Sequence, residues 1–303
     1  MNKHIQGYLS NQYAKSLNEF GEPIYMKHCG GWILKRRIPG SDYYDAMSLY
    51  PLFCCKRWEN IQRDIDEISD SIVSLTLITN PFIDTKANED VFSEKMATFK
   101  PHYVLDLTPK LSDSFSSHHS YYVRRSLKDI SVEIVRDKTS FVEKWIRLYQ
   151  YLVDRHNITG IQAFSERSFR QQMKVPGLYC FQAKNDLGDV VGAELWFKQG
   201  DRVYSHLSAY NAEGYDLSAS YAIHGKALEY FKELGARWVD LGGGAGIDTD
   251  GTDGLSKFKK GWVNTEKDVH LCGVILNRGV YSKLSEDVGL TDYFPKYRYG
   301  EFD

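Results

Sequence analysis

Residues Trp238 to Trp262, WVDLGGGAGIDTDGTDGLSKFKKGW, predict a short apolar strand, a glycine-rich turn and a helix that presents several lysines. Glycine lets a backbone turn sharply and come close to a ligand, because no Cβ stands in the way. Gly242, Gly243 and Gly244 at the end of a strand therefore indicate a functional site.

Two common phosphate-binding motifs do not fit this stretch. A P-loop requires a lysine directly after its last glycine, whereas Thr252 follows Gly251. The dinucleotide-binding fingerprint Gly-x-Gly-x-x-Gly, started at Gly242, would need a third glycine where the chain has Ile247. Both motifs are excluded by their spacing.

Strand and helix signals alternate along the rest of the chain. Before position 135 we expect strands over 31–38, 45–53, 71–78 and 103–107, and helices from Trp58 and over 117–128. After it we expect a strand over 132–136, a helix with a capping box from Ser140 to Glu143, and a short helix after Ser165. Strands over 178–182, 190–197 and 202–210, a helix capped by Asp216, and strands over 238–241 and 269–276 complete the pattern.

The composition is typical of a globular protein: 42% of the 303 residues are hydrophobic and 26% are charged. A net charge of −2 argues against nucleic-acid binding over the whole surface, although it allows a local basic groove. No run approaches the roughly 18 apolar residues of a membrane span, and the N-terminal residues lack the apolar region of a secretion signal. Five cysteines without a Cys-x-x-Cys pair disfavour a disulfide framework, so we expect a cytoplasmic protein.

The glycine block resembles that of a known family. Asp240-Leu-Gly-Gly-Gly244, then Asp253-Gly-Leu-Ser-Lys-Phe-Lys259 and Gly261-Trp262, resembles the "LGGG … DgLf-x-FK-x-gF" block of the Fem-type peptidyltransferases. These are relatives of the GNAT acyltransferases and consist of two GNAT-like halves. The expected order of elements after residue 135 is also the GNAT order. The first half matches only in its order of elements and in one helix, Tyr-Tyr-Val-Arg-Arg-Ser-Leu-Lys.

The resemblance implies an α/β (α+β) fold of two tandem GNAT-like halves, each with a mixed, mostly antiparallel sheet. We expect the first half over 1–135 and the second, which carries the glycine block, over 136–303. In this arrangement the tail after Leu290 can cross back and pack on the first half.

The resemblance also implies an acyltransferase that forms an amide on an amine acceptor. The first hypothesis is transfer from an aminoacyl-tRNA to a cell-wall (peptidoglycan) or sugar-linked precursor, with no tightly bound cofactor. The alternatives are an acyl-CoA-dependent N-acyltransferase of polysaccharide or natural-product biosynthesis, and a non-catalytic GNAT-like binding module. The chain has no sustained heptad for the coiled-coil arm of many Fem-type enzymes, which argues against tRNA use, although several members of the family lack the arm. Neither the transferred group, the acceptor nor the oligomeric state follows from the sequence.

The expected donor site favours tRNA over acyl-CoA. GNAT enzymes hold the coenzyme A pyrophosphate on a glycine-rich loop at a helix N-terminus. The corresponding loop here, Asn211–Ser218, has one glycine and carries Glu213 and Asp216, whose charges repel a phosphate.

Lys259 is the candidate for stabilising the oxyanion that develops during acyl transfer. The resemblance places the ammonium of the Phe258-Lys259 pair in the site, together with Gly242–Gly244. The alternative is that Lys257, Lys259 and Lys260 form one solvated helix face.

Other candidates carry less specific signals. Arg124 and Arg125 can hold a phosphate of the acceptor, or lie on a solvated basic face. Glu194 is either a general base or a residue that faces water. Tyr204 and His206 share one face of a strand, as substrate-binding residues or as hydrogen-bonded core residues.

We expect no metal site. His118 and His119 are adjacent on a helix, where their side chains diverge, and no cysteine or carboxylate lies at ligand spacing. The histidines are expected to be structural or exposed, and His224 is expected in the core.

Overall fold

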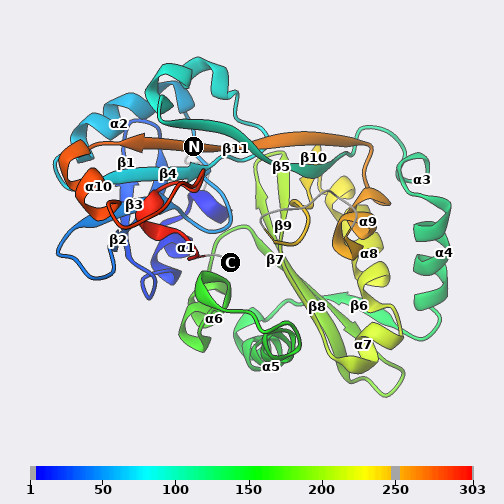
Figure 1. Ribbon diagram of the computed structural model, residues 1–303. Helices are drawn as coiled ribbons and strands as arrows, with labels where there is room; N and C mark the ends of the chain where they lie inside the picture. The colour runs from blue at the N-terminus through cyan, green and yellow to red at the C-terminus, as the bar shows by residue number, and fades with distance from the viewer. Residues whose placement is uncertain (1–4, 247–252, 302–303) are drawn as a thin grey trace. The chain divides into compact units, whose positions relative to one another are not determined.

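The computed structural model describes residues 5–246 and 253–301, and the chain forms two compact units (Figure 1). Unit 1 comprises Met1–Gln12 and His102–Lys267, and unit 2 comprises Tyr13–Pro101 and Asp268–Asp303. The expected boundary near residue 135 concerns a duplication of two halves, which the compact units do not test, and it stays a prediction.

Unit 1 is built on a mixed sheet in the order β5-β10-β9-β8-β7-β6. Its strands are β5 (Lys95–Asp106, shared with unit 2), β6 (Ser131–Ile134), β7 (Leu178–Lys184), β8 (Val190–Gln199), β9 (Arg202–Tyr210) and β10 (Trp238–Asp240). The pairing is antiparallel except between β9 and β10, which run parallel.

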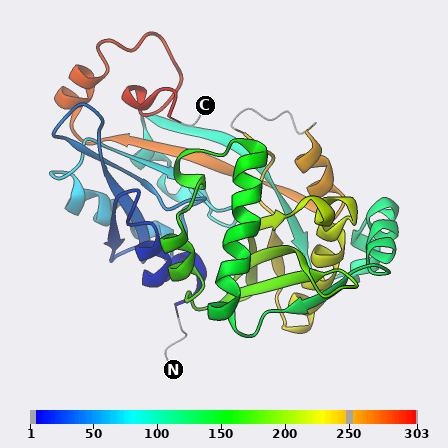
Figure 2. The ribbon, with the colours of Figure 1, turned by 90° about the horizontal axis from the view of Figure 1, so that it is seen from below.

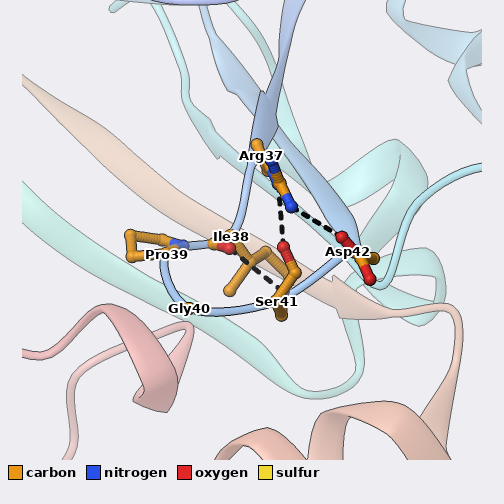
Figure 3. Close-up of a pocket in the computed structure, with 6 residues that line it drawn as sticks. All are labelled: Arg37, Ile38, Pro39, Gly40, Ser41 and Asp42. Carbon is orange, nitrogen blue, oxygen red and sulfur yellow. Dashed lines mark hydrogen bonds and ion pairs between the residues drawn. The ribbon is translucent and has the colours of Figure 1, made fainter.

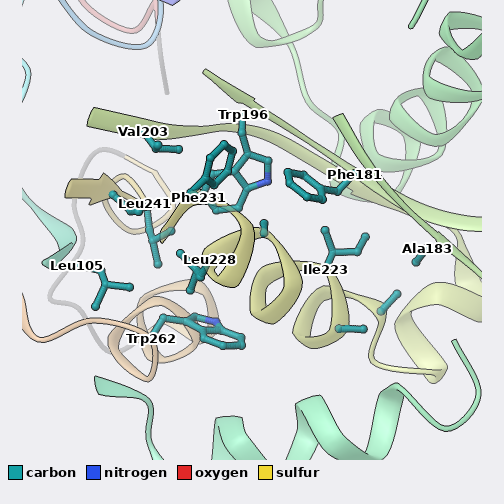
Figure 4. Packing of buried hydrophobic residues seen from close by; sticks show 14 of the residues in the cluster. Leu105, Phe181, Ala183, Trp196, Val203, Ile223, Leu228, Phe231, Leu241 and Trp262 are labelled. Carbon is teal, nitrogen blue, oxygen red and sulfur yellow. The ribbon is translucent and has the colours of Figure 1, made fainter. Parts of the chain in front are cut away.

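Helices cover both faces of this sheet (Figures 1 and 2). On one face lie α4 (Ser117–Ser126), α7 (Ala212–Asp216), α8 (Ala219–Glu233) and α9 (Gly254–Lys260). On the other lie α5 (Lys138–His156) and α6 (Glu166–Gln172), and α3 (Leu111–Ser114) precedes α4. Figure 4 shows the core under α8, where Trp196, Phe231 and Trp262 are fully buried. Apolar burial of this kind is the main stabilising term of the fold.

Unit 2 repeats the pattern of one parallel pair within an antiparallel sheet, in the order β1-β2-β3-β4-β11. Its strands are β1 (Glu22–Met26), β2 (Gly31–Arg37), β3 (Tyr44–Ser48), β4 (Ser74–Ile78) and β11 (Thr265–Ile275). Its helices are α1 (Asn11–Ser16), α2 (Ile61–Ile68) and α10 (Arg278–Leu284). The parallel pair is β3 with β4, as β9 with β10 in unit 1.

The predicted fold class is confirmed, and local boundaries differ. The capping box at Ser140 is wrong: α5 begins at Lys138, and Asp137 caps it by accepting bonds from the backbone N–H groups of Thr139 and Ser140. An aspartate at the N-cap satisfies these donors directly, which frees Glu143 to bind Arg170. Asp216 likewise does not cap the long helix α8, because the short helix α7 ends at it.

Candidate active site

The glycine turn begins where β10 ends. Gly242 has φ +76°, a backbone conformation that favours glycine, and its N–H donates to Oδ1 of Asp240 over 2.8 Å. Its carbonyl accepts a bond from the N–H of Tyr103 on β5 over 3.1 Å. The turn is thus fixed from both sides, and residues 247–252, farther along the block, lie outside the described residues.

Lys259 reaches this turn from α9. Its Nζ donates to the carbonyl oxygen of Gly243 over 2.6 Å, and the side chain is half-buried. Lys257 and Lys260 are exposed, and Lys260 lies 4.0 Å from Glu266. The three lysines therefore do not form one equivalent solvated face. An ammonium group held at the glycine turn can donate hydrogen bonds to a developing oxyanion.

Aromatic packing fixes the helix that carries Lys259. Phe258 packs against Tyr221 and His224 of α8, with ring centroids 5.1 and 4.9 Å away. Trp262, just after α9, is fully buried and stacks on His224 at 5.6 Å. Because these contacts bury the neighbours of Lys259, they limit the motion of its backbone.

His119 on α4 holds the C-terminal end of α9. Its Nε2–H donates to the carbonyl oxygen of Phe258 over 2.8 Å, and the hydroxyl of Ser116 lies 2.8 Å from Nδ1. A carbonyl only accepts, so the proton lies on Nε2, and burial lowers the pKa of His119, which favours this neutral form. The ring also occupies the space beside Gly261, where a Cβ would lie 1.8 Å from it. The sequence predicts only that His119 is structural or exposed; the cap on α9 is a finding of the structure.

Glu194 is fully buried in unit 1, so the alternative that it faces water is wrong. Its carboxylate accepts bonds from Nε1 of Trp196 at 3.1 Å, from Nδ1 of His224 at 2.7 Å and from the hydroxyl of Tyr210. Burial raises the pKa of Tyr210 well above its usual value, which keeps that hydroxyl a donor. The carboxylate thereby links β8 to the helix face under Phe258, and its role as a general base stays a prediction.

Tyr204 and His206 are buried in β9, on the side of Tyr8. His206 lies 3.0 Å from the hydroxyl of Tyr8 through Nδ1 and 3.2 Å from Oε1 of Gln172 through Nε2. Burial lowers the pKa of His206 to about 3, so the ring is neutral at physiological pH. Both residues have core contacts, and their binding of substrate stays a prediction.

Arg124 and Arg125 are exposed in the last turn of α4. The guanidinium of Arg125 lies 5.9 Å from the ring of Tyr122. They follow His119 by five and six residues, which is about 8 Å along a helix. His119, near the start of α4, contacts α9, whereas the two arginines lie at the other end of α4. Their binding of a phosphate stays a prediction.

Strands β9 and β10 separate from each other next to the glycine turn. The two strands pair over three positions, the last being Tyr204 with Asp240. β9 continues to Tyr210, whereas the chain leaves β10 through Gly242. The pairing therefore ends where Gly243 and Lys259 meet.

The loop after β9 is folded into a capped helix. The side chain of Asn211 accepts a bond from the N–H of Gly214 at the start of α7. A Cβ on Gly214 would lie 2.1 Å from the carbonyl oxygen of Val191, so this glycine allows close packing on β8. Glu213 stays in the first turn of α7 and binds Asn185.

Unit 2 contains two further polar groupings. His28, Asp64 and Glu67 have ligand atoms within 4.8 Å of one another, but both Asp64 oxygens accept backbone N–H bonds and Glu67 pairs with Lys27. The expectation of no metal stays a prediction. In the turn between β2 and β3, Figure 3 shows the residues that line a pocket, where Arg37 binds Ser41 and Asp42 of the same turn.

The sequence from α4 to α9 matches a known family. Residues 118–259 match the family described as the acetyltransferase (GNAT) domain. The matching segment, 142 of the 303 residues, is similar to a GNAT acetyltransferase domain. The expectation of an acyltransferase is thereby confirmed.

Solved structures extend the likeness beyond this domain. FemX has a TM-score of 0.70 at 14% identity, over 93% of this chain and 95% of that chain. L-PGS from Bacillus licheniformis has a TM-score of 0.60 at 12% identity, over 91% and 95%. The C-terminal domain of a protein described as a lysylphosphatidylglycerol synthetase from Agrobacterium fabrum has a TM-score of 0.64 at 12% identity, over 92% of both chains.

At these identities the likeness is one of fold, and the predicted resemblance to Fem-type GNAT proteins is confirmed at that level. Comparison with curated proteins gives no match. In the part of the chain that the structure describes, none of the helices has the length and apolarity of a membrane span.

Proposed function

We propose that this GNAT acyltransferase transfers an aminoacyl group from a charged tRNA to an amine on a phosphate-bearing cell-wall or sugar-linked precursor. The observation that carries the proposal is Lys259, held by the carbonyl of Gly243 where the pairing of β9 and β10 ends. Because tRNA is charged in the cytoplasm, the reaction would take place there.

The chemistry required is attack of a neutral amine on the ester carbonyl of the donor. The carbonyl oxygen gains negative charge in the tetrahedral intermediate, and preorganised donors lower the barrier most where this charge develops. The ammonium of Lys259 would supply such a donor. Arg124 and Arg125 would bind acceptor phosphate, with Gly242–Gly244 and Phe258 shaping the site.

The start of α7 supports tRNA over acyl-CoA as the donor. The side chain of Asn211 already occupies the N–H of Gly214, and the carboxylate of Glu213 lies in the first turn. A pyrophosphate at this helix start would find the N–H of Gly214 already hydrogen-bonded and would be repelled by the carboxylate of Glu213. One neighbour with the same fold is the C-terminal domain of a protein described as a lysylphosphatidylglycerol synthetase, a name that refers to an aminoacyl product.

A transfer assay tests the donor. Bulk tRNA charged with radiolabelled amino acids is mixed with the protein and a nucleotide-linked cell-wall peptide that has a free lysine amine. We expect label in a product that withstands mild base, because amides survive the treatment that cleaves the tRNA ester. Titration calorimetry should show no tight binding of acetyl-CoA. A low-micromolar dissociation constant, about −8 kcal/mol, would instead favour the acyl-CoA-dependent reaction.

Lys259→Met should lower turnover in this assay about 100-fold or more, the usual cost of losing one oxyanion donor. The melting temperature should change little, because the side chain is only half-buried. The exposed neighbours provide matched controls, since Lys257→Met and Lys260→Met remove the same charge from the same helix. Equal, small losses in all three variants would contradict a role for Lys259.

A further inference from the structure

A histidine and an aspartate form a buried pair on the strands that lead into the glycine turn. Nδ1 of His102 on β5 lies 3.0 Å from both carboxylate oxygens of Asp240 on β10. The side chains are 9% and 2% exposed. The two residues are 138 positions apart in the sequence, and no motif predicts their contact.

The chemistry of the pair fixes the position of the imidazole proton. A carboxylate only accepts hydrogen bonds, so the neutral ring carries its proton on Nδ1 and keeps a lone pair on Nε2. Among the described residues Nε2 has no hydrogen-bond partner, and it is not sealed from solvent as Nδ1 of His270 is. An imidazole oriented by a carboxylate, with its second nitrogen accessible, is the arrangement of a general base.

The pair is joined to the same turn as Lys259. Oδ1 of Asp240 also accepts the N–H of Gly242, and the next residue, Gly243, accepts the bond from Lys259. Tyr204 is the register neighbour of Asp240 on β9. One carboxylate therefore orients the imidazole and closes the turn that holds the ammonium.

We propose that His102 is the general base of acyl transfer and that Asp240 positions it. The inference rests on the proposed transferase function. Nε2 takes a proton from the ammonium form of the acceptor, and the neutral amine attacks the ester carbonyl. The C–N bond forms, the ester C–O bond breaks, and the second proton of the nitrogen passes to the leaving hydroxyl. Imidazolium then returns its proton to solvent.

The first test needs no substrate. Long-range ¹H–¹⁵N spectra of protein labelled in its nine histidines, compared with those of His102→Gln to assign the signal, report which ring nitrogen carries the proton. We expect a protonated Nδ1 and a bare Nε2 for His102. Asp240→Asn keeps an oxygen for Gly242 but removes the charge that holds this tautomer, so the signal should shift. A protonated Nε2 in the wild-type protein would overturn the proposal.

The second test uses the transfer assay. His102→Gln should lower kcat about 100-fold or more, within the usual contribution of a general base, with KM changed little. His102→Ala should regain part of its turnover when free imidazole is added, a gain that a purely structural role does not predict. His270→Gln is the matched control, because His270 is also a strand histidine and should lose less than twofold. Turnover of His102→Gln within a few-fold of wild type would refute the assignment.

The two tests separate failure of this inference from failure of the proposed function. A wild-type protein that transfers nothing from charged tRNA or acetyl-CoA refutes the function and the base together. A wild-type protein that is active, beside an equally active His102→Gln, refutes only the base.

Discussion

His206 is a buried histidine whose environment makes stability depend on pH. Its ring lies between Tyr8 and Gln172, and burial lowers its pKa from 6.5 to about 3. Between pH 6.5 and pH 3, His206 is therefore protonated in the unfolded chain and neutral in the folded chain. Stability that is present above pH 6.5 is lost as pH falls towards 3.

We expect the free energy of unfolding to fall by up to about 1.4 kcal/mol per pH unit below pH 6 because of this group. Urea titrations at pH 7, 6, 5 and 4 measure the slope. His206→Gln is less stable at pH 7 but should show a shallower dependence on pH. An unchanged slope in the variant would show that other groups cause the acid loss.

Single residues were predictable where a local pattern distinguished them. The sequence block around Lys259 distinguished this lysine from Lys257 and Lys260. In the structure Lys259 is half-buried and the other two are exposed. Glu194 could not be placed, because its partners Tyr210 and His224 are brought to it by folding. A polar residue in an apolar strand indicates burial or function equally until its donors are known.

At the scale of elements, α9 shows what sequence periodicity leaves out. The sequence predicted the helix, and Asp253 caps its start as the local pattern allows. Its other end depends on His119, which belongs to α4 and comes 139 residues before Phe258. Helix ends held by side chains from elsewhere in the chain have no local signal.

Gly261→Ala should therefore disturb the end of α9. The new Cβ would lie 1.8 Å from the ring of His119, so the ring or the helix must move. Overpacking of this kind typically costs 1–3 kcal/mol, and displacement of α9 should also reduce transfer through Lys259. Chemical denaturation and the transfer assay measure the two effects.

Gly254→Ala is the control on the same helix, because no heavy atom lies within 4 Å of its Cβ position. Alanine favours a helix over glycine by up to about 1 kcal/mol, so this variant should be neutral or more stable. Adding His119→Ala to Gly261→Ala should restore part of the lost stability. Equal free energies of unfolding for the two glycine variants would show that the ring of His119 moves aside without loss of stability.

At the scale of the whole molecule, the strands of the two units share one plan: each set contains one parallel pair among antiparallel pairs. The fold class was predictable because the order of strands and helices is local information, whereas the division into two halves near residue 135 stays a prediction. The composition of the units was not, since each joins segments from distant parts of the sequence. Contacts that close such units are long-range and become visible only in the structure.

Unit 2 is closed by a buried ion pair between its strands and the end of the chain. Arg298 donates to Asp45 on β3 through Nε at 2.5 Å and Nη2 at 2.9 Å, and the side chains are 6% and 2% exposed. Without Arg298 the buried carboxylate of Asp45 keeps, among the described residues, only the more distant cation Arg36, whose Nε lies 3.7 Å away, so Arg298→Met should destabilise the protein by about 3–5 kcal/mol in denaturant titrations.

The size of this loss should depend on burial rather than on the removal of an arginine. Arg37→Met breaks a comparable pair with Asp42, but those side chains are 64% and 96% exposed, so it should cost less than about 1 kcal/mol. Adding Asp45→Leu to Arg298→Met removes the carboxylate that has lost its main partner, while Arg36 keeps its pair with Glu301, and should recover part of the loss, because apolar replacement of both partners is often tolerated. Similar losses for Arg37→Met and Arg298→Met, or no recovery in the double variant, would mean that the last residues contribute to unit 2 by packing rather than by this pair.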